Sequence, residues 1–309
     1  MKLATSTGDF AWYQDSVAER IACYEGGKFR YLNLEMPVLP ELMNDGEDWR
    51  HLADAWSKAA EKAGVTFVVA HAPCLHIPIL NDEETYRRNT RAIRRSIELC
   101  HLLGIGRVVV HASACKEFTP EQFRQYNKKF YQNVLEPAEK HSITVMTENW
   151  DGYEYHCSTG KQLREFLDDM NHPLLAACWD TAHANIDPTT RQIGQYENIL
   201  ALGDKLKGVH IADNFGDSHH HTWPFAGVIQ FDSVMQGLLD VNYDGYFTFE
   251  ASYSLLHSKN PPFGRQAWEH NGQVVTKLHS PSLELKKQAV DLLYEVGRHM
   301  LTSYDCYEE

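Results

Sequence analysis

Six short apolar runs in this chain each end in a side chain that can ligate a metal ion, and their spacing strongly constrains the fold. The residues concerned are His71, His111, Glu148, Asp180, His210 and Glu250. Successive members lie 40, 37, 32, 30 and 40 residues apart, which is about the length of one strand followed by one helix. Six consecutive units bring these side chains together only if the strands are parallel and their carboxyl ends converge. A closed parallel barrel meets this condition, and the active site of such a barrel lies at that face.

Strand and helix signals alternate along the whole chain. Strands are expected at 2–7, 30–36, 66–70, 107–110, 143–147, 174–179, 206–211 and 245–249. Helices are expected at 15–23, 48–63, 81–103, 119–140, 159–170, 195–202, 231–239 and 282–300. The strands are continuously apolar, which is typical of a parallel sheet covered on both faces. The sequence therefore predicts an α/β fold, a (β/α)8 TIM barrel that forms a single domain over residues 1–309.

One long stretch, residues 251–280, separates the last predicted strand from the last predicted helix. It is rich in Pro, Gly, Asn, His and Ser. Structureless loops of this size in a compact domain are usually functional. Because the stretch leaves the ligand-bearing end of the barrel, we predict that it is an active-site lid. A disordered insertion is the alternative, although Tyr253, Phe263 and Trp268 favour packing.

The overall charge argues against polyanionic partners. The formal net charge is −13, with 42 acidic residues, and such a field repels nucleic acids and anionic membrane surfaces. No segment has the apolar length of a membrane helix, and the residues after Lys2 are too polar for a signal peptide. Seven cysteines without a CxxC pair favour reduced thiols and a cytoplasmic location. The expected partner is a small sugar or polyol, and the sequence leaves a homo-oligomer open.

The last four strand ends carry the residues Glu148, Asp180, His210 and Glu250. Three carboxylates and one imidazole suit a divalent ion such as manganese, magnesium, cobalt or zinc, with open positions for substrate oxygens. A single buried Asp is usually a capping or ion-pair residue, but four such residues after successive strands form a specific pattern. We therefore predict a divalent metal cofactor bound by these four side chains.

Five histidines form a second group of candidates: His71, His111, His183, His219 and His221. Each of the first three could be a core histidine satisfied by a backbone carbonyl. The last two lie in the His-rich stretch 217–221, which could be a solvated loop. Together the five could hold a second metal ion or bind substrate hydroxyl groups.

Seven segments carry a resemblance to a known family: 70–80, 108–113, 147–150, 179–183, 208–214, 220–227 and 247–252. They resemble the xylose-isomerase-like barrel superfamily, which contains sugar isomerases, ketose 3-epimerases, inosose dehydratases and the class II apurinic endonucleases of the endonuclease IV type. In members that resemble ketose epimerases, the positions matching Glu148, Asp180, His210 and Glu250 bind one divalent metal ion. The resemblance also implies that the two glutamates act as acid and base, and that His183 binds a substrate oxygen.

Two departures complicate this resemblance. The arginine that follows the strand-seven histidine in ketose epimerases has no counterpart in residues 211–218. Conversely, His71, His111, His183 and His221 match zinc-binding positions of the endonucleases, and His219 falls where that family has an Asp. The chain therefore nearly completes the three-metal set of the endonucleases.

The function that these residues favour is a divalent-metal-dependent isomerase or epimerase of a sugar, polyol or keto-sugar. A metal ion that polarises a carbonyl acidifies the neighbouring carbon, and Glu148 and Glu250 would then transfer the proton through a metal-bound enediolate. His183, Glu35 and Trp150 are the candidate substrate-binding residues. No Gly-rich phosphate loop is present, so an unphosphorylated substrate is expected.

Three alternatives compete with this interpretation. A dehydratase acting on an inosose or keto-sugar would need the same groups. A zinc-cluster phosphodiesterase of the endonuclease IV type would use the histidines, but DNA binding needs basic loops, which the acidic composition opposes. A non-catalytic sugar- or metal-binding barrel would be expected to lack the acid and base, whereas Glu148 and Glu250 are both present.

Overall fold

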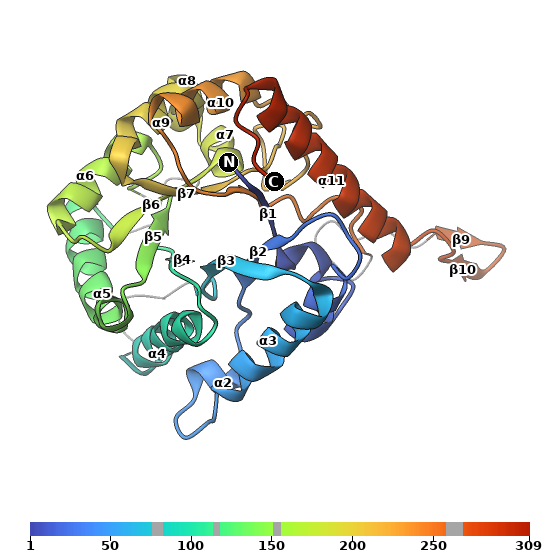
Figure 1. The fold of residues 1–309 in the computed structure, drawn as a ribbon, viewed down its shortest axis with the longest axis horizontal. Coiled ribbons are helices and arrows are strands. Elements are labelled where there is room, and N and C mark those ends of the chain that lie inside the picture. Colours follow the sequence, from blue (N-terminus) through green and yellow to red (C-terminus); the bar gives the residue numbers. More distant parts are fainter. Residues whose placement is uncertain (76–82, 114–117, 151–155, 258–267) are drawn as a thin grey trace.

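The computed structural model describes residues 1–75, 83–113, 118–150, 156–257 and 268–309. Eight strands form one parallel sheet (Figure 1): β1 Leu3–Ser6, β2 Tyr31–Glu35, β3 Thr66–His71, β4 Arg107–Val109, β5 Thr144–Glu148, β6 Leu175–Asp180, β7 Leu206–His210 and β8 Phe247–Phe249. Their order in the sheet is β7-β6-β5-β4-β3-β2-β1-β8. The ring closes between β7 and β8, where the Ile211 amide donates to the Thr248 carbonyl (2.8 Å) and the Glu250 amide donates to the Ile211 carbonyl (3.1 Å). The predicted (β/α)8 barrel is thereby confirmed.

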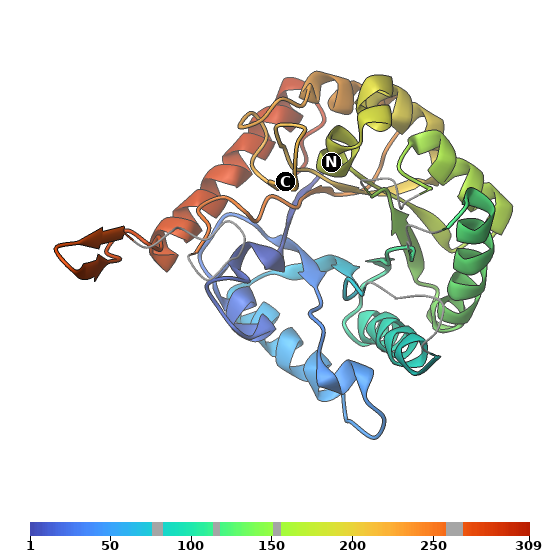
Figure 2. The same cartoon turned by 180° about the vertical axis from the view of Figure 1, so that it is seen from behind.

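Helices surround the strands, as seen from both ends of the barrel (Figures 1 and 2). They are α1 Val17–Ala22, α2 Pro40–Met43, α3 His51–Ala63, α4 Glu83–Leu102, α5 Pro120–His141, α6 Gly160–Met170, α7 Thr181–Ile186, α8 Pro188–Ile193, α9 Gln195–Leu202, α10 Phe231–Asp240 and α11 Leu283–Ser303, with 3-10 turns η1 Thr7–Phe10 and η2 Gly203–Lys205. Several ends follow local rules. Thr119 and Thr159 form capping boxes at the starts of α5 and α6, and Gly64 ends α3 with a φ of 68°. The predicted start of α4 at residues 81–82 lies outside the described residues.

The barrel interior is filled by a small apolar cluster, which consists of Val69, Val109, Met146, Ala176 and Cys178. Gly208 of β7 makes room for it, since a Cβ atom there would lie 2.8 Å from the Met146 sulfur. A separate and larger core packs between the sheet and the helices. The interior cluster is thus a packed floor and not a pore.

The segment after β8 has two described parts. Residues 251–257 stay close to the strand ends, where the Tyr13 hydroxyl donates to the Leu255 carbonyl (2.5 Å). Strands β9 Trp268–His270 and β10 Gln273–Val275 pair as an antiparallel hairpin, which extends sideways from the barrel beyond the start of α11 (Figures 1 and 2). Residues 258–267, including Phe263, lie outside the described residues, so the lid role of 251–280 stays a prediction.

The membrane-helix and cysteine expectations can be compared with the structure only within the described residues. Within them, no helix combines the length and the apolar character that crossing a bilayer requires. Six of the seven cysteines are described, and none of these six takes part in a disulfide. Cys115 lies outside the described residues.

Candidate active site

The candidate ligands form the layer directly above the apolar floor of the barrel. Side chains alternate between the two faces of a strand, so residues two positions apart point the same way. Val69, Val109, Met146 and Cys178 point into the barrel, and the residues two positions later are His71, His111, Glu148 and Asp180. His210 stands in the same relation to Gly208. The strand period therefore aims five of the six predicted ligands at one point, and Glu250 joins them directly after β8.

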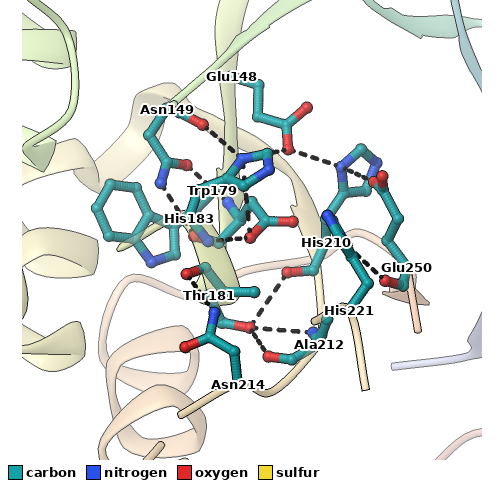
Figure 3. A network of polar contacts seen from close by, with 12 residues as sticks. Glu148, Asn149, Trp179, Thr181, His183, His210, Ala212, Asn214, His221 and Glu250 are labelled. Atoms are coloured by element: carbon teal, nitrogen blue, oxygen red, sulfur yellow. Dashed lines mark hydrogen bonds and ion pairs between the residues drawn. The ribbon is translucent and has the colours of Figure 1, made fainter. Parts of the chain in front are cut away.

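The central group consists of Glu148, Asp180, His210 and Glu250, whose ligand atoms all lie within 4.8 Å of one another. The Nδ1 atom of His210 lies 3.0 Å from Glu148 Oε1 and 2.6 Å from Glu250 Oε2. Figure 3 shows the His210 ring between the two glutamates, with contacts to both. All four residues that the sequence assigns to the first metal are thus brought together.

Backbone hydrogen bonds hold Asp180 in place. Its Oδ1 atom accepts the His183 amide (2.6 Å), which makes Asp180 the N-cap of α7. Its own amide donates to Asn149 Oδ1 (2.7 Å), and Asn149 Nδ2 donates back to the Asp180 carbonyl (2.9 Å). Because one carboxylate oxygen is used as a cap, the other oxygen, Oδ2, is left for a ligand.

The central group fits a divalent ion. Within the described part of the chain, two of its buried polar atoms, Asp180 Oδ2 and His210 Nε2, have no hydrogen-bond partner, while Glu148 Oε2 and Glu250 Oε2 face histidine nitrogens. Burying carboxylate oxygens without donors is costly, and a cation among them removes that cost. The mixed oxygen and nitrogen donors suit manganese, cobalt, magnesium or zinc.

The electrostatics of the group agree with this fit. Burial, followed by the charge of Glu148, raises the pKa of Asp180 to about 7. Burial would also raise the pKa of Glu148, but the neighbouring histidines outweigh it and hold that pKa well below its usual range. Burial opposes protonation of His210, yet Cys178 and the two glutamates outweigh it and raise its pKa. The site therefore stabilises positive charge between two ionised glutamates.

A second group, formed by His71, His111 and Glu148, shares its glutamate with the first. The Nε2 atoms of the two histidines lie 2.9 Å apart, and they lie 3.6 and 3.3 Å from Glu148 Oε2. His71 Nδ1 donates to the Ala72 carbonyl (2.7 Å), which turns Nε2 inward. Burial lowers the pKa of His111 to about 4, so this imidazole is neutral at pH 7 and can act as a ligand.

The third group is formed by His183, His219 and His221. His183 Nδ1 donates to the Asn149 carbonyl and His221 Nδ1 donates to the Glu250 carbonyl, both at 3.0 Å. A carbonyl that holds one ring nitrogen leaves the other nitrogen free to ligate, which is a common arrangement around metal ions. Burial also lowers the pKa of His183. Four of the five predicted second-layer histidines therefore contact Glu148 or Glu250, and His219 packs against His183 and His221.

The cleft above these groups has a volume of about 190 Å³. Of the predicted substrate-binding residues, Glu35, Trp150 and His183 all line it. The Trp150 ring centre lies 4.5 Å from that of His111 and 4.7 Å from that of His183. Asn33, to which no sequence pattern pointed, also lines the cleft, and its buried Oδ1 atom has no hydrogen-bond partner among the described residues. This oxygen can accept a hydrogen bond from a substrate hydroxyl group.

Asp213, to which no sequence pattern pointed either, holds the loop that carries two histidines of the third group. Its carboxylate accepts the backbone amides of Asn214 (2.9 Å), Gly227 (2.9 Å) and Ile229 (3.1 Å). These contacts fix both ends of the 214–229 loop, which carries His219 and His221. Asp213 lies in a segment that carries the family resemblance, but its role depends on contacts with residues up to 16 positions away.

Comparisons with known proteins identify the family and the fold. The family model described as "Xylose isomerase-like TIM barrel" matches residues 29–271. The chain is 31% identical over 121 residues to the L-ribulose 3-epimerase of Methylomonas sp. (strain DH-1), which is 39% of each protein. It is 26% identical over 176 residues to the probable endonuclease 4 of Methanoculleus marisnigri, which is 54% of this chain and 62% of that protein.

Both of those alignments span less than two thirds of the length of the relative. Among solved structures, that of D-psicose 3-epimerase with D-tagatose from Clostridium cellulolyticum H10 superposes with a TM-score of 0.71. The superposition covers 97% of this chain and 99% of that chain at 14% sequence identity. At this identity the likeness shows a common fold.

Proposed function

Because this chain belongs to the xylose isomerase-like TIM barrel family, we propose that it is a divalent-metal-dependent isomerase or epimerase of a sugar or keto-sugar. One observation carries the proposal. The ligand atoms of Glu148, Asp180, His210 and Glu250 lie within 4.8 Å of one another beside a cleft that Glu250 lines, and among the described residues the buried Asp180 Oδ2 atom has no hydrogen-bond partner. Similarity to an L-ribulose 3-epimerase supports the same class of reaction.

The proposed chemistry is proton transfer at a carbon next to a carbonyl group. The four residues of the central group would hold the ion, which polarises a carbonyl oxygen when bound and so acidifies the neighbouring C–H bond. Glu148 and Glu250 lie on either side of His210, and both carboxylates have lowered pKa values. Each is therefore ionised at neutral pH and can accept a proton from carbon. One glutamate removes the proton, and the other, or the same one, returns it.

The remaining cleft residues would orient the substrate. His183 and Trp150 lie on one side of the cleft, while Asn33 and Glu35 come from β2 on the other. Imidazole, amide and carboxylate groups can all form hydrogen bonds with sugar hydroxyls, and the Trp150 ring offers an apolar face. The same set could serve a dehydratase acting on a keto-sugar or inosose, which is a variant of this proposal.

A second candidate function is hydrolysis of a phosphodiester by a zinc cluster. The observation that favours it is that the central group and the His71–His111 group share Glu148, with a group of three histidines beside them. Similarity to a probable endonuclease 4 supports it as well. The net charge of −13 opposes DNA as the substrate.

Metal content and two variants test the proposal. We expect about one manganese, cobalt or magnesium ion per chain and turnover of at least one ketose or inosose in a panel. Glu148→Gln and Glu250→Gln should each lower kcat by about 100-fold or more while the protein stays folded. Glu165→Gln, at an ion-paired surface position, is the matched control. Retained activity in either site variant would defeat the acid and base assignment, and two or three zinc ions per chain would favour the hydrolase.

A further inference from the structure

We propose that the cleft contains a second subsite, which binds a neutral sugar ring, so that the substrate is a glycoside of a keto-sugar. The subsite lies beside the metal-binding groups and is built around Trp12 and Arg20. The inference rests on the proposed function for the reaction itself, but the subsite can be tested by binding alone.

The cleft continues from the metal-binding groups into a second chamber of about 340 Å³, which is larger than the 190 Å³ of the first. Glu35, His221, Glu250 and Tyr253 line both chambers. A ligand held at the central group in the first chamber therefore has direct access to the second. This continuity makes the outer chamber an extension of the same site.

The two chambers differ in chemistry. The inner chamber is lined by ligand-type side chains such as His71, His111 and His183, whereas the outer chamber adds Trp12, Arg20 and Ser252. An indole ring can pack on the apolar face of a sugar, and a guanidinium group and a carboxylate can bond to its hydroxyls. The outer chamber thus has the composition of a carbohydrate-binding site, and it shares Glu250 and His221 with the metal-binding groups at its boundary.

The charges favour a neutral occupant over a phosphate or carboxylate. Among the described residues that line the outer chamber, Arg20 alone is a lysine or arginine, while Glu35 and Glu250 line it with negative charge. Arg20 is also already engaged, because its Nε atom donates to the Gln14 carbonyl (3.1 Å) and its Nη2 atom donates to the Asp15 carbonyl (3.3 Å). An anion would therefore meet two carboxylates and a partly occupied guanidinium group.

The walls of the outer chamber are fixed by specific contacts. A Cβ atom at Gly8 would lie 1.9 Å from Glu35 Oε2, so only glycine lets this carboxylate lie at the boundary of the chambers. On the opposite wall, Lys286 Nζ donates to the carbonyls of Ser252 (2.9 Å) and Ser254 (2.6 Å). The Tyr13–Leu255 hydrogen bond joins the two walls. The chamber is therefore held open by contacts between residues 8–20 and 251–257.

Isothermal titration calorimetry on the manganese-loaded protein tests the subsite. The probes are free fructose and three two-ring ketoses, namely turanose, lactulose and isomaltulose, which join the second ring to different positions of fructose. We expect at least one two-ring ketose to bind about tenfold or more tightly than fructose. If none of the three binds more tightly than fructose, the proposal is overturned.

Two variants place the preference in the outer chamber. Trp12→Ala should reduce the affinity ratio of the best two-ring ketose over fructose by about fivefold or more, because it removes the stacking surface. Ala11→Phe, which fills the chamber from a position on its wall, should reduce the same ratio if Trp12→Ala does not fold. Phe225→Ala, at an aromatic residue 62% exposed elsewhere on the surface, is the control and should leave the ratio unchanged. A ratio that neither cleft variant changes would contradict the proposal.

Turnover separates this inference from the proposed function. If the protein epimerises fructose but does not prefer two-ring ketoses, the proposed function is supported and the subsite is contradicted. If the protein binds two-ring ketoses more tightly than fructose but converts no ketose, the subsite is supported and the proposed function is contradicted.

Discussion

Replacing Lys286 with Met tests how the fold holds the segment that follows Glu250. Lys286 lies on α11 with a side chain that is only 1% exposed. Its two hydrogen bonds go to the backbone carbonyls of Ser252 and Ser254. The charged group that acts on it is Asp9, which is itself buried and accepts hydrogen bonds from Thr5 (2.6 Å) and Tyr24 (3.0 Å). A buried ammonium group therefore links the last helix to the wall of the cleft.

The size of the effect follows from three contributions. Burial lowers the pKa of Lys286 from 10.5 to about 8, with Asp9 opposing the shift, so charging the buried amine costs about 3 kcal/mol at neutral pH. Each hydrogen bond to the charged group contributes about 1.5–3 kcal/mol. Removing the lysine also leaves Asp9 without its cation. We expect Lys286→Met to lower the free energy of unfolding by about 2 kcal/mol at pH 7.

The pH dependence provides the sharper test. The pKa of Lys286 is lower in the folded protein than in the unfolded chain, so the unfolded chain binds more protons between pH 8 and 10.5. The wild-type protein therefore gains up to about 3 kcal/mol of stability from this group as the pH rises through that window. The Met variant lacks this gain, and the difference in stability between the two proteins should widen.

Urea unfolding of both proteins at pH 7, 9 and 10 measures this difference. Lys161→Met, at a lysine that is 79% exposed, serves as the control and should show a small difference that does not change with pH. A difference for Lys286→Met that stays constant or narrows from pH 7 to 10 would refute the assignment of Lys286 as a buried, charged link.

Three further predictions concern the site. Asp213→Ala removes the acceptor of three backbone amides in the 214–229 loop and should lower the free energy of unfolding by about 2–4 kcal/mol, which thermal unfolding measures. The loosened loop should also weaken metal binding, which metal titration measures. Gly8→Ala should displace the Glu35 carboxylate and weaken sugar binding in calorimetry, with far-ultraviolet circular dichroism to confirm that the fold persists. Removing metal with EDTA should lower the midpoint of thermal unfolding, because an ion present at 100 times its Kd stabilises the fold by about 2.7 kcal/mol; an unchanged midpoint in protein shown to be metal-free would count against a bound ion.

The strand ends and the ligand layer could be read from the sequence because their causes are local. The period of two along a strand places His71, Glu148 and Asp180 two residues beyond apolar side chains that point into the barrel. Helix limits at Thr119 and Gly64 follow from hydrogen bonds and backbone angles within one turn. These regularities were enough to predict eight strands and the residues at their carboxyl ends.

The tertiary structure alone decided how those residues are grouped in space. The sharing of Glu148 by two donor groups depends on which of its oxygens faces which histidine, and no spacing in the chain encodes that. The outer chamber forms because β1 and β8 pair, which places residues 8–20 beside 251–257. The buried Lys286 likewise lies far along the chain from Asp9. Contacts between residues more than 200 positions apart leave no local pattern, because they arise only when the barrel closes.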